Sequence, residues 1–169
     1  MTGKTEARTR ARRIAAAART GALAGLAGAG AMLLTEQVEQ AITHRPNSYV
    51  PGRALLRLFG RRPTEGERPA GWNYAMHFGT GAALGAVRGI WAVTGLRGPL
   101  AVAAHTVIRL GFDQTVENAT GAGAPPATWP TQEKVVDLLH KTVFAAVTGV
   151  LVDRALRPAL ESRAGRLSH

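Results

Sequence analysis

The stretch Leu100-Ala-Val-Ala-Ala-His-Thr-Val-Ile-Arg-Leu-Gly-Phe-Asp-Gln-Thr-Val-Glu117 sets ionisable residues at regular intervals in an apolar run. Four of them recur at every fourth position: His105, Arg109, Asp113 and Glu117. On a helix of 3.6 residues per turn they form one stripe that drifts by about 40° per step. Ionisable groups in an apolar helix are costly to leave in contact with lipid, so they face other helices. The stretch therefore predicts a helical bundle with a polar interior.

Three further apolar segments accompany the one at 99–117, over residues 14–41, 72–96 and 132–157. All are rich in alanine and glycine, and their uninterrupted apolar runs are shorter than the roughly 20 residues of an isolated span. A soluble four-helix bundle is the alternative, but its helices would carry a charged face along their length. Residues 142–152 contain no ionisable side chain, and residues 75–87 contain only His77. We therefore predict an all-α, four-helix transmembrane bundle with short Gly/Ala-rich spans.

The remaining segments are polar, and we expect them to lie outside the bundle. Residues 1–13 and 158–169 are predicted to be basic tails, the first of them disordered. A Pro/Gly/Arg-rich loop is predicted over residues 44–71, in which 51–59 form either an interfacial amphipathic turn or part of a solvated loop. A signal peptide is a competing interpretation of residues 14–34. Because no polar mature segment follows at once, an uncleaved first helix is favoured.

The chain is strongly basic, with 21 Lys and Arg against 11 Asp and Glu, and a net charge of +10. Such a charge fits nucleic acid or an anionic lipid surface. Aromatic residues make up only 5% and no nucleic-acid motif is visible, so we expect the lipid bilayer as partner and no nucleic acid. Basic residues flank the apolar segments and favour both termini in the cytoplasm. The absence of cysteine excludes thiolate sites.

Glycines at intervals of four residues predict where helices approach closely. Gly21 and Gly25 lie on the first helix, and Gly81, Gly85 and Gly89 on the second. Small residues at this spacing let helix backbones meet in lipid. The same faces are candidates for a homo-oligomeric contact or for binding another membrane protein.

Antiparallel spans bring the polar ends of all four helices to one side of the bundle. The predicted polar intramembrane cluster comprises nine residues: Glu36, His77, His105, Arg109, Asp113, Glu117, Asp137, His140 and Lys141. Arg109 is its deepest charge, and Asp113, one turn away, is the expected partner. Asp137 or Glu36 would extend the network to other helices.

Three functions are compatible with such a cluster. It handles protons, an ion or a small polar solute, or it only orients the helices of a structural or assembly subunit. The third possibility is a metal- or haem-binding redox bundle, for which Asp137, His140 and His77 are weak candidate ligands. No cofactor is predicted, because a di-iron site would need a second carboxylate-x-x-His motif. No serine elbow, HExxH motif or phosphate loop indicates an enzyme, and no catalytic residue is assigned.

Two motifs give the chain a family resemblance. They are Tyr74-Ala-Met-His-Phe78 before a glycine-rich span, and a later run of Pro125-Pro126, Trp129-Pro130, Glu133, Asp137 and His140-Lys141. Over residues 72–157 this pattern resembles the YagU-like family of bacterial inner-membrane proteins. The resemblance implies a multi-pass inner-membrane protein without an established activity, with His77 and His140 as the best-matching positions.

Overall fold

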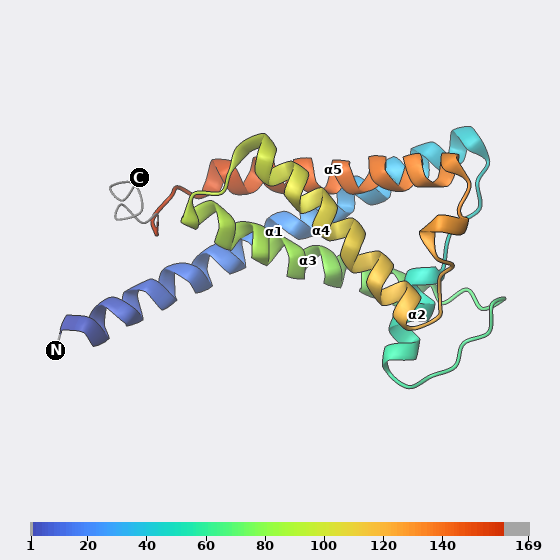
Figure 1. Cartoon of the computed structure of the whole chain (residues 1–169), viewed down its shortest axis with the longest axis horizontal. Helices are drawn as coiled ribbons and strands as arrows, with labels where there is room; N and C mark the ends of the chain where they lie inside the picture. Colours follow the sequence, from blue (N-terminus) through green and yellow to red (C-terminus); the bar gives the residue numbers. More distant parts are fainter. Residues whose placement is uncertain (1, 161–169) are drawn as a thin grey trace.

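The structure is a computed structural model that describes the backbone of residues 2–160 and the side chains of residues 4–160. This part of the chain is all-α. Its elements, in order, are α1 (Thr2–Thr43), α2 (Val50–Leu58), α3 (Ala70–Thr94), α4 (Gly98–Ala119), a 3-10 turn (Pro126–Thr128) and α5 (Thr131–Ala155). The four long helices alternate in direction, so the end of α1, the start of α3, the end of α4 and the start of α5 lie at one end of the bundle (Figure 1).

Local backbone chemistry explains where the long helices stop and start. Gly95 ends α3 in the left-handed conformation, with φ of 103°, and the Leu96 amide donates to the Trp91 carbonyl. Pro99 lies in the first turn of α4, where its missing N–H leaves no hydrogen bond unmade. Pro158 follows shortly after α5, which ends at Ala155.

The prediction of a disordered tail over residues 1–13 is wrong for the part that the structure describes, because α1 begins at Thr2. Alanine, arginine and lysine are strong helix formers, and the packed part of α1 supplies the nucleus from which the helix extends. Residues 4–13 are exposed and project beyond the bundle (Figure 1). Of the predicted C-terminal tail, residues 161–169 lie outside the described residues.

The loop 44–71 contains a true helix. In α2, Gly52, Ala54 and Leu56 are buried, whereas Leu58 is exposed. Asn73 at the start of α3 anchors it, because its Oδ1 accepts the Gly52 amide at 2.9 Å. Between the two possibilities for residues 51–59, the structure therefore has an amphipathic helix.

Glycines form the contact between α1 and α3, the most extensive helix–helix contact in the fold. A Cβ added at Gly21 would lie 2.2 Å from the Gly85 carbonyl oxygen, and one at Gly25 would lie 2.1 Å from that of Gly81. A Cβ at Gly89 would meet the Ala17 carbonyl oxygen at 2.1 Å. All five glycines singled out in the sequence are thus occupied within the chain and are not free for a partner.

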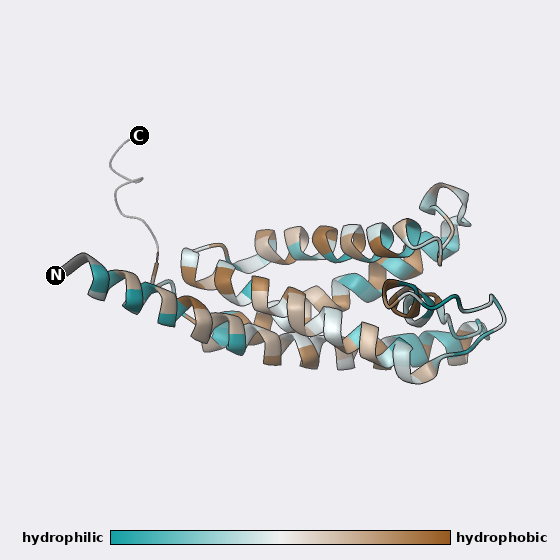
Figure 2. Ribbon diagram, turned by 90° about the horizontal axis from the view of Figure 1, so that it is seen from below, coloured by the Kyte–Doolittle hydropathy of each residue, from teal (hydrophilic) through white to brown (hydrophobic). Residues whose placement is uncertain are grey.

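Large apolar side chains lie on the outside of the bundle. The exposed set includes Leu23, Leu34, Val38 and Ile42 on α1, Leu100, Val107, Ile108 and Phe112 on α4, and Val135, Leu138, Leu139, Val150 and Leu151 on α5. The buried set includes three cationic side chains, those of Arg88, Arg109 and Lys141. Hydrophilic residues otherwise gather in the N-terminal part of α1 and around α2 (Figure 2).

Two helical segments are long and apolar enough to cross a membrane, Lys4–Thr43 and Thr131–Ala155. Within the described residues, α3 and α4 are long enough to cross a membrane but are not apolar enough. Alanine and glycine contribute little hydropathy, and α4 also carries its stripe of ionisable residues. Length and composition therefore identify two candidate spans rather than the four predicted.

Candidate functional site

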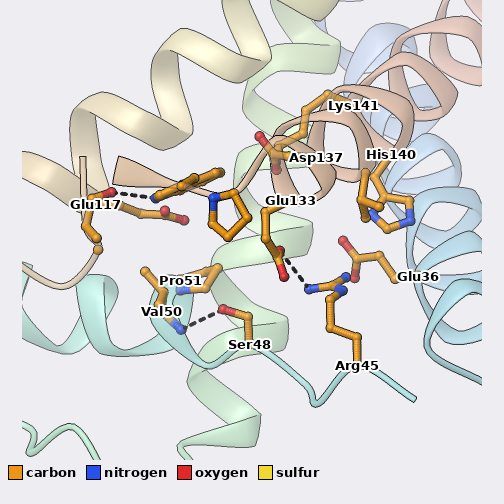
Figure 3. A pocket seen from close by; sticks show the side chains of 15 residues that line it. Glu36, Arg45, Ser48, Val50, Pro51, Glu117, Glu133, Asp137, His140 and Lys141 are labelled. Atoms are coloured by element: carbon orange, nitrogen blue, oxygen red, sulfur yellow. Dashed lines mark hydrogen bonds and ion pairs between the residues drawn. The ribbon is translucent and has the colours of Figure 1, made fainter. Parts of the chain in front are cut away.

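A polar cavity of about 350 Å³ opens at the end of the bundle where α1 ends and α5 begins. Its walls come from α1, α2, the end of α4, the loop that follows α4, and the start of α5 (Figure 3). The ionisable residues that line this polar cavity are Glu36, Arg45, Glu117, Glu133, Asp137, His140 and Lys141. Five of these seven belong to the predicted cluster; Arg45 and Glu133 do not.

An ion-pair chain joins α4 to α5 beside the polar cavity. Arg109 Nε lies 2.9 Å from Asp113 Oδ2, and Lys141 Nζ lies 3.5 Å from the same oxygen. Lys141 also pairs with Asp137, one turn earlier on α5. Arg109 and Asp113 are buried, and the Arg109 guanidinium lies 4.9 Å from the centre of the Phe144 ring. Arg109 thus pairs with Asp113, as the sequence predicts.

Arg45 bridges α1 and α5 across the mouth of the polar cavity. Its Nη2 donates to Glu39 Oε2 at 2.8 Å, and its Nη1 lies 3.7 Å from Glu133 Oε2. The hydrogen bond that Arg45 donates to the Glu39 carboxylate raises the pKa of the Arg45 guanidinium above its usual value. Sequence reasoning placed Arg45 with the loop arginines; only the turn at His44, with φ of 58°, brings it back over α1.

Three side chains of the polar cavity form no ion pair within 4.0 Å and no side-chain hydrogen bond in the described part of the chain. The Glu36 and Glu117 carboxylates have no side-chain partner, and Nε2 of the buried His140 has none either. In Figure 3 the His140 ring lies beside the Glu36 carboxylate. The lining holds four acids against two permanent bases, so the polar cavity has an excess of acidic groups.

His77 and His105 do not join this network, although both were placed in the predicted cluster. His77 Nε2 donates to the Ala29 carbonyl at 2.9 Å, and His105 Nε2 donates to the Leu84 carbonyl at 3.2 Å. A carbonyl oxygen only accepts, so Nε2 of each ring carries the proton. The two histidines therefore tie α3 to α1 and α4 to α3, as polar residues do between membrane helices.

Within the described residues, the three candidate metal ligands are not brought together. Among residues 4–160, no three His, Asp or Glu side chains are placed so that they could share a metal ion. Of the three candidate ligands, Asp137 and His140 line the polar cavity, whereas His77 is bonded to Ala29.

Sequence reasoning missed a second group of buried charges at the opposite end of the bundle, which we call the Asp153 cluster. Arg88, fully buried, donates from Nη2 to Asp153 Oδ1 at 2.7 Å. Arg97 Nε lies 3.4 Å from the same oxygen, and the Gly98 amide donates to Asp153 Oδ2 at 3.0 Å. Arg88 and Asp153 lie far along two helices that run in the same direction, and this matched depth is the signal that could have paired them.

Comparison of the chain with protein-family models, with curated proteins and with solved structures gave no match. Its function is therefore inferred from the geometry of the described residues.

Proposed function

We propose that this chain is a multi-pass membrane protein in which α1, α3, α4 and α5 all span the bilayer. The observation that carries the proposal is the distribution of side chains, which is the reverse of that in a water-soluble protein. Leucine, isoleucine and valine cover the outside of α1, α4 and α5, while arginine, lysine and histidine are buried between the helices. Lipid favours this arrangement, because apolar groups face hydrocarbon and ionisable groups pair inside the bundle.

The same arrangement accounts for the low hydropathy of α3 and α4. Arg88 on α3 is fully buried, and Arg109 and Asp113 on α4 are almost fully buried. Their charges count against a span when composition is averaged, yet they do not face lipid. At the start of α3 the side chains of Trp72 and Tyr74 are exposed, and both residue types favour the membrane interface.

The charge distribution favours an orientation with both termini in the cytoplasm of a bacterial cell. Basic residues in the N-terminal part of α1, at Arg97 and after Asp153 outnumber those on the side of α2. The motif-level resemblance to YagU-like inner-membrane proteins agrees with this location. The polar cavity would then open away from the cytoplasm.

For the polar cavity itself, the function that fits best is the binding and passage of a proton or a small cation. Glu36 and Glu117 are carboxylates without a partner, and His140 presents a free ring nitrogen beside Glu36. Acidic groups exceed permanent bases, which favours a positively charged ligand over an anion. Ion homeostasis is the corresponding physiological role.

Proteoliposomes containing the purified protein test this role through the flux of H⁺, Na⁺ or K⁺. We expect Glu36→Gln and Glu117→Gln each to reduce flux several-fold, because each removes a charge without removing an ion pair. Glu6→Gln is the matched control, since Glu6 is an exposed acid in the projecting part of α1. Equal flux in all four proteins would count against transport through the polar cavity.

A structural or assembly subunit is the second candidate, and internal pairing favours it. Asp113, Asp137 and Glu133 each face a base of the same chain. In that case Glu36→Gln and Glu117→Gln leave flux unchanged, whereas loss of Arg109 or Lys141 lowers stability. Because the five repeated glycines are occupied internally, a partner would contact other surfaces. Gly79 and Gly111 are candidates, since nothing lies within 4 Å of a Cβ at either position.

A further inference from the structure

A second hollow lies on the outer surface between α4 and α5, and along α5 it runs from Leu138, the neighbour of the polar-cavity residue Asp137, to Asp153. This groove has a volume of about 880 Å³ and mainly apolar walls, formed by Val102, Ala103 and Val107 on α4 and by Leu138 and Val150 on α5. Its floor is closed where Val102 packs on Gly149: a Cβ at Gly149 would lie 2.9 Å from Val102 Cγ2. The small side chain of Ala103 leaves the wall of the groove open on α4.

The groove has the length of a lipid chain. Leu138 and Asp153 mark its two ends on α5, and at 1.5 Å per residue they are about 22 Å apart. One leaflet of a bilayer contributes about 15 Å of hydrocarbon, half of the roughly 30 Å core. The groove is therefore about 7 Å longer than one leaflet, so an extended acyl chain that follows α5 from a polar end at Asp153 to Leu138 would reach past the middle of the bilayer.

The end of the groove at Asp153 is cationic. Asp153 is neutralised by Arg88 at 2.7 Å and faces Arg97 as well, and Arg154 at the rim is exposed and has no partner in the described part of the chain. Two arginines thus face one carboxylate, and Arg154 adds a third positive charge at the rim. Nε and Nη1 of the fully buried Arg88 have no hydrogen-bond partner, and Nε lies only 3.8 Å from a Cβ position at Gly149, on the groove floor. Anions are attracted to such an end.

An apolar channel with a cationic end fits an amphiphile that has an anionic head. The end in question is the one where α1 begins and α5 ends, which the proposed orientation places at the cytoplasmic leaflet. That leaflet is the one rich in anionic lipid. We propose that the groove between α4 and α5 binds one molecule of an anionic phospholipid. Its acyl chain would lie between Val102 on α4 and Leu138 on α5, and its phosphate would lie near Arg154. The inference rests on the membrane location proposed above.

Lipid retention by the full-length protein in detergent tests the inference. The probes are phosphatidylglycerol and phosphatidylcholine with identical acyl chains, and bound lipid is counted by native mass spectrometry. We expect the wild-type protein to retain one phosphatidylglycerol, with a several-fold preference over phosphatidylcholine. Ala103→Trp fills the groove and should abolish retention. Ala83→Trp is the matched control, because Ala83 is an exposed alanine of α3 outside the groove.

A charge variant separates the head group from the chain. Arg154→Gln should bring the affinities for the two lipids close together, whereas Arg10→Gln, an equal loss of charge in the projecting part of α1, should leave the preference intact. Should Ala103→Trp not fold, Ala103→Leu narrows the groove with less strain and should weaken retention. Equal retention in the Ala103 and Ala83 variants, or no preference between the lipids in the wild type, overturns the inference.

Extraction of native membranes with alkaline carbonate keeps the two proposals distinguishable. A protein that stays in the membrane pellet but shows no lipid preference contradicts only the groove assignment. A protein that is released into the supernatant contradicts the membrane location, and the groove assignment with it.

Discussion

The two ends of the bundle hold similar chemical groups in different proportions. In the Asp153 cluster a single carboxylate faces two arginines and one backbone amide, and the groove beside it has mainly apolar walls. At the other end, four acids and two permanent bases surround a space of about 350 Å³. The first arrangement uses every oxygen of its acid, whereas the second leaves Glu36 and Glu117 unpaired. Buried charge can thus serve cohesion at one end and ligand binding at the other.

The largest effect is expected from Asp153→Ala, which leaves the fully buried Arg88 without a counter-charge. Breaking a buried pair by removing one partner costs about 3–5 kcal/mol. The free energy of unfolding in detergent measures the loss. Replacing both partners, as in Arg88→Met with Asp153→Leu, should restore most of it. A loss below about 1 kcal/mol for Asp153→Ala would show that Arg88 does not depend on this pair.

A smaller effect is expected from Arg109→Leu at the other end. Asp113 then keeps Lys141 at 3.5 Å, so the variant should cost about 2 kcal/mol, the range of a hydrogen bond to a charged group. Thermal unfolding under the same conditions provides the comparison. The double variant Arg109→Leu with Lys141→Met should lose more than the sum of the single losses, because only then is Asp113 stranded. If Arg109→Leu alone exceeds Asp153→Ala, the contrast between the two ends is reversed.

The smallest effect on stability is expected from Glu36→Gln. Its carboxylate has no partner and borders the polar cavity, so the free energy of unfolding should change by no more than about 0.5 kcal/mol. Measured alongside cation flux, this variant separates binding from cohesion: flux falls while stability is kept. A stability loss near that of Arg109→Leu would mean that Glu36 has a structural partner.

Much of the helical architecture was predictable because local signals set it. The expected segments 72–96, 99–117 and 132–157 differ from α3, α4 and α5 by one or two residues at each end. Gly95, Pro99 and Pro158 fix these ends through backbone conformation alone. The start of α1 was not predictable in this way, because a basic, exposed segment is helical only through its continuity with a packed helix.

In the candidate site, too, contacts set by local sequence were predictable and contacts set by tertiary structure were not. Arg109 with Asp113 and Lys141 with Asp137 are one turn apart, so helical spacing alone pairs them. Arg45 returns to α1 through a turn whose geometry depends on tertiary structure. His77 and His105 have the spacing of cluster members, yet each finds a backbone carbonyl of a neighbouring helix, and no sequence pattern distinguishes that outcome.

The length of α1 has one more consequence. It is a single helix from Thr2 to Thr43, so the same rigid rod carries the exposed arginines near Arg8 and the wall of the polar cavity at Glu36, about 42 Å away. The glycine contact with α3 lies between them and acts as a fulcrum. We therefore expect a sideways load on the projecting arm to be felt along α1 at Glu36, against the contact that α1 makes with α5.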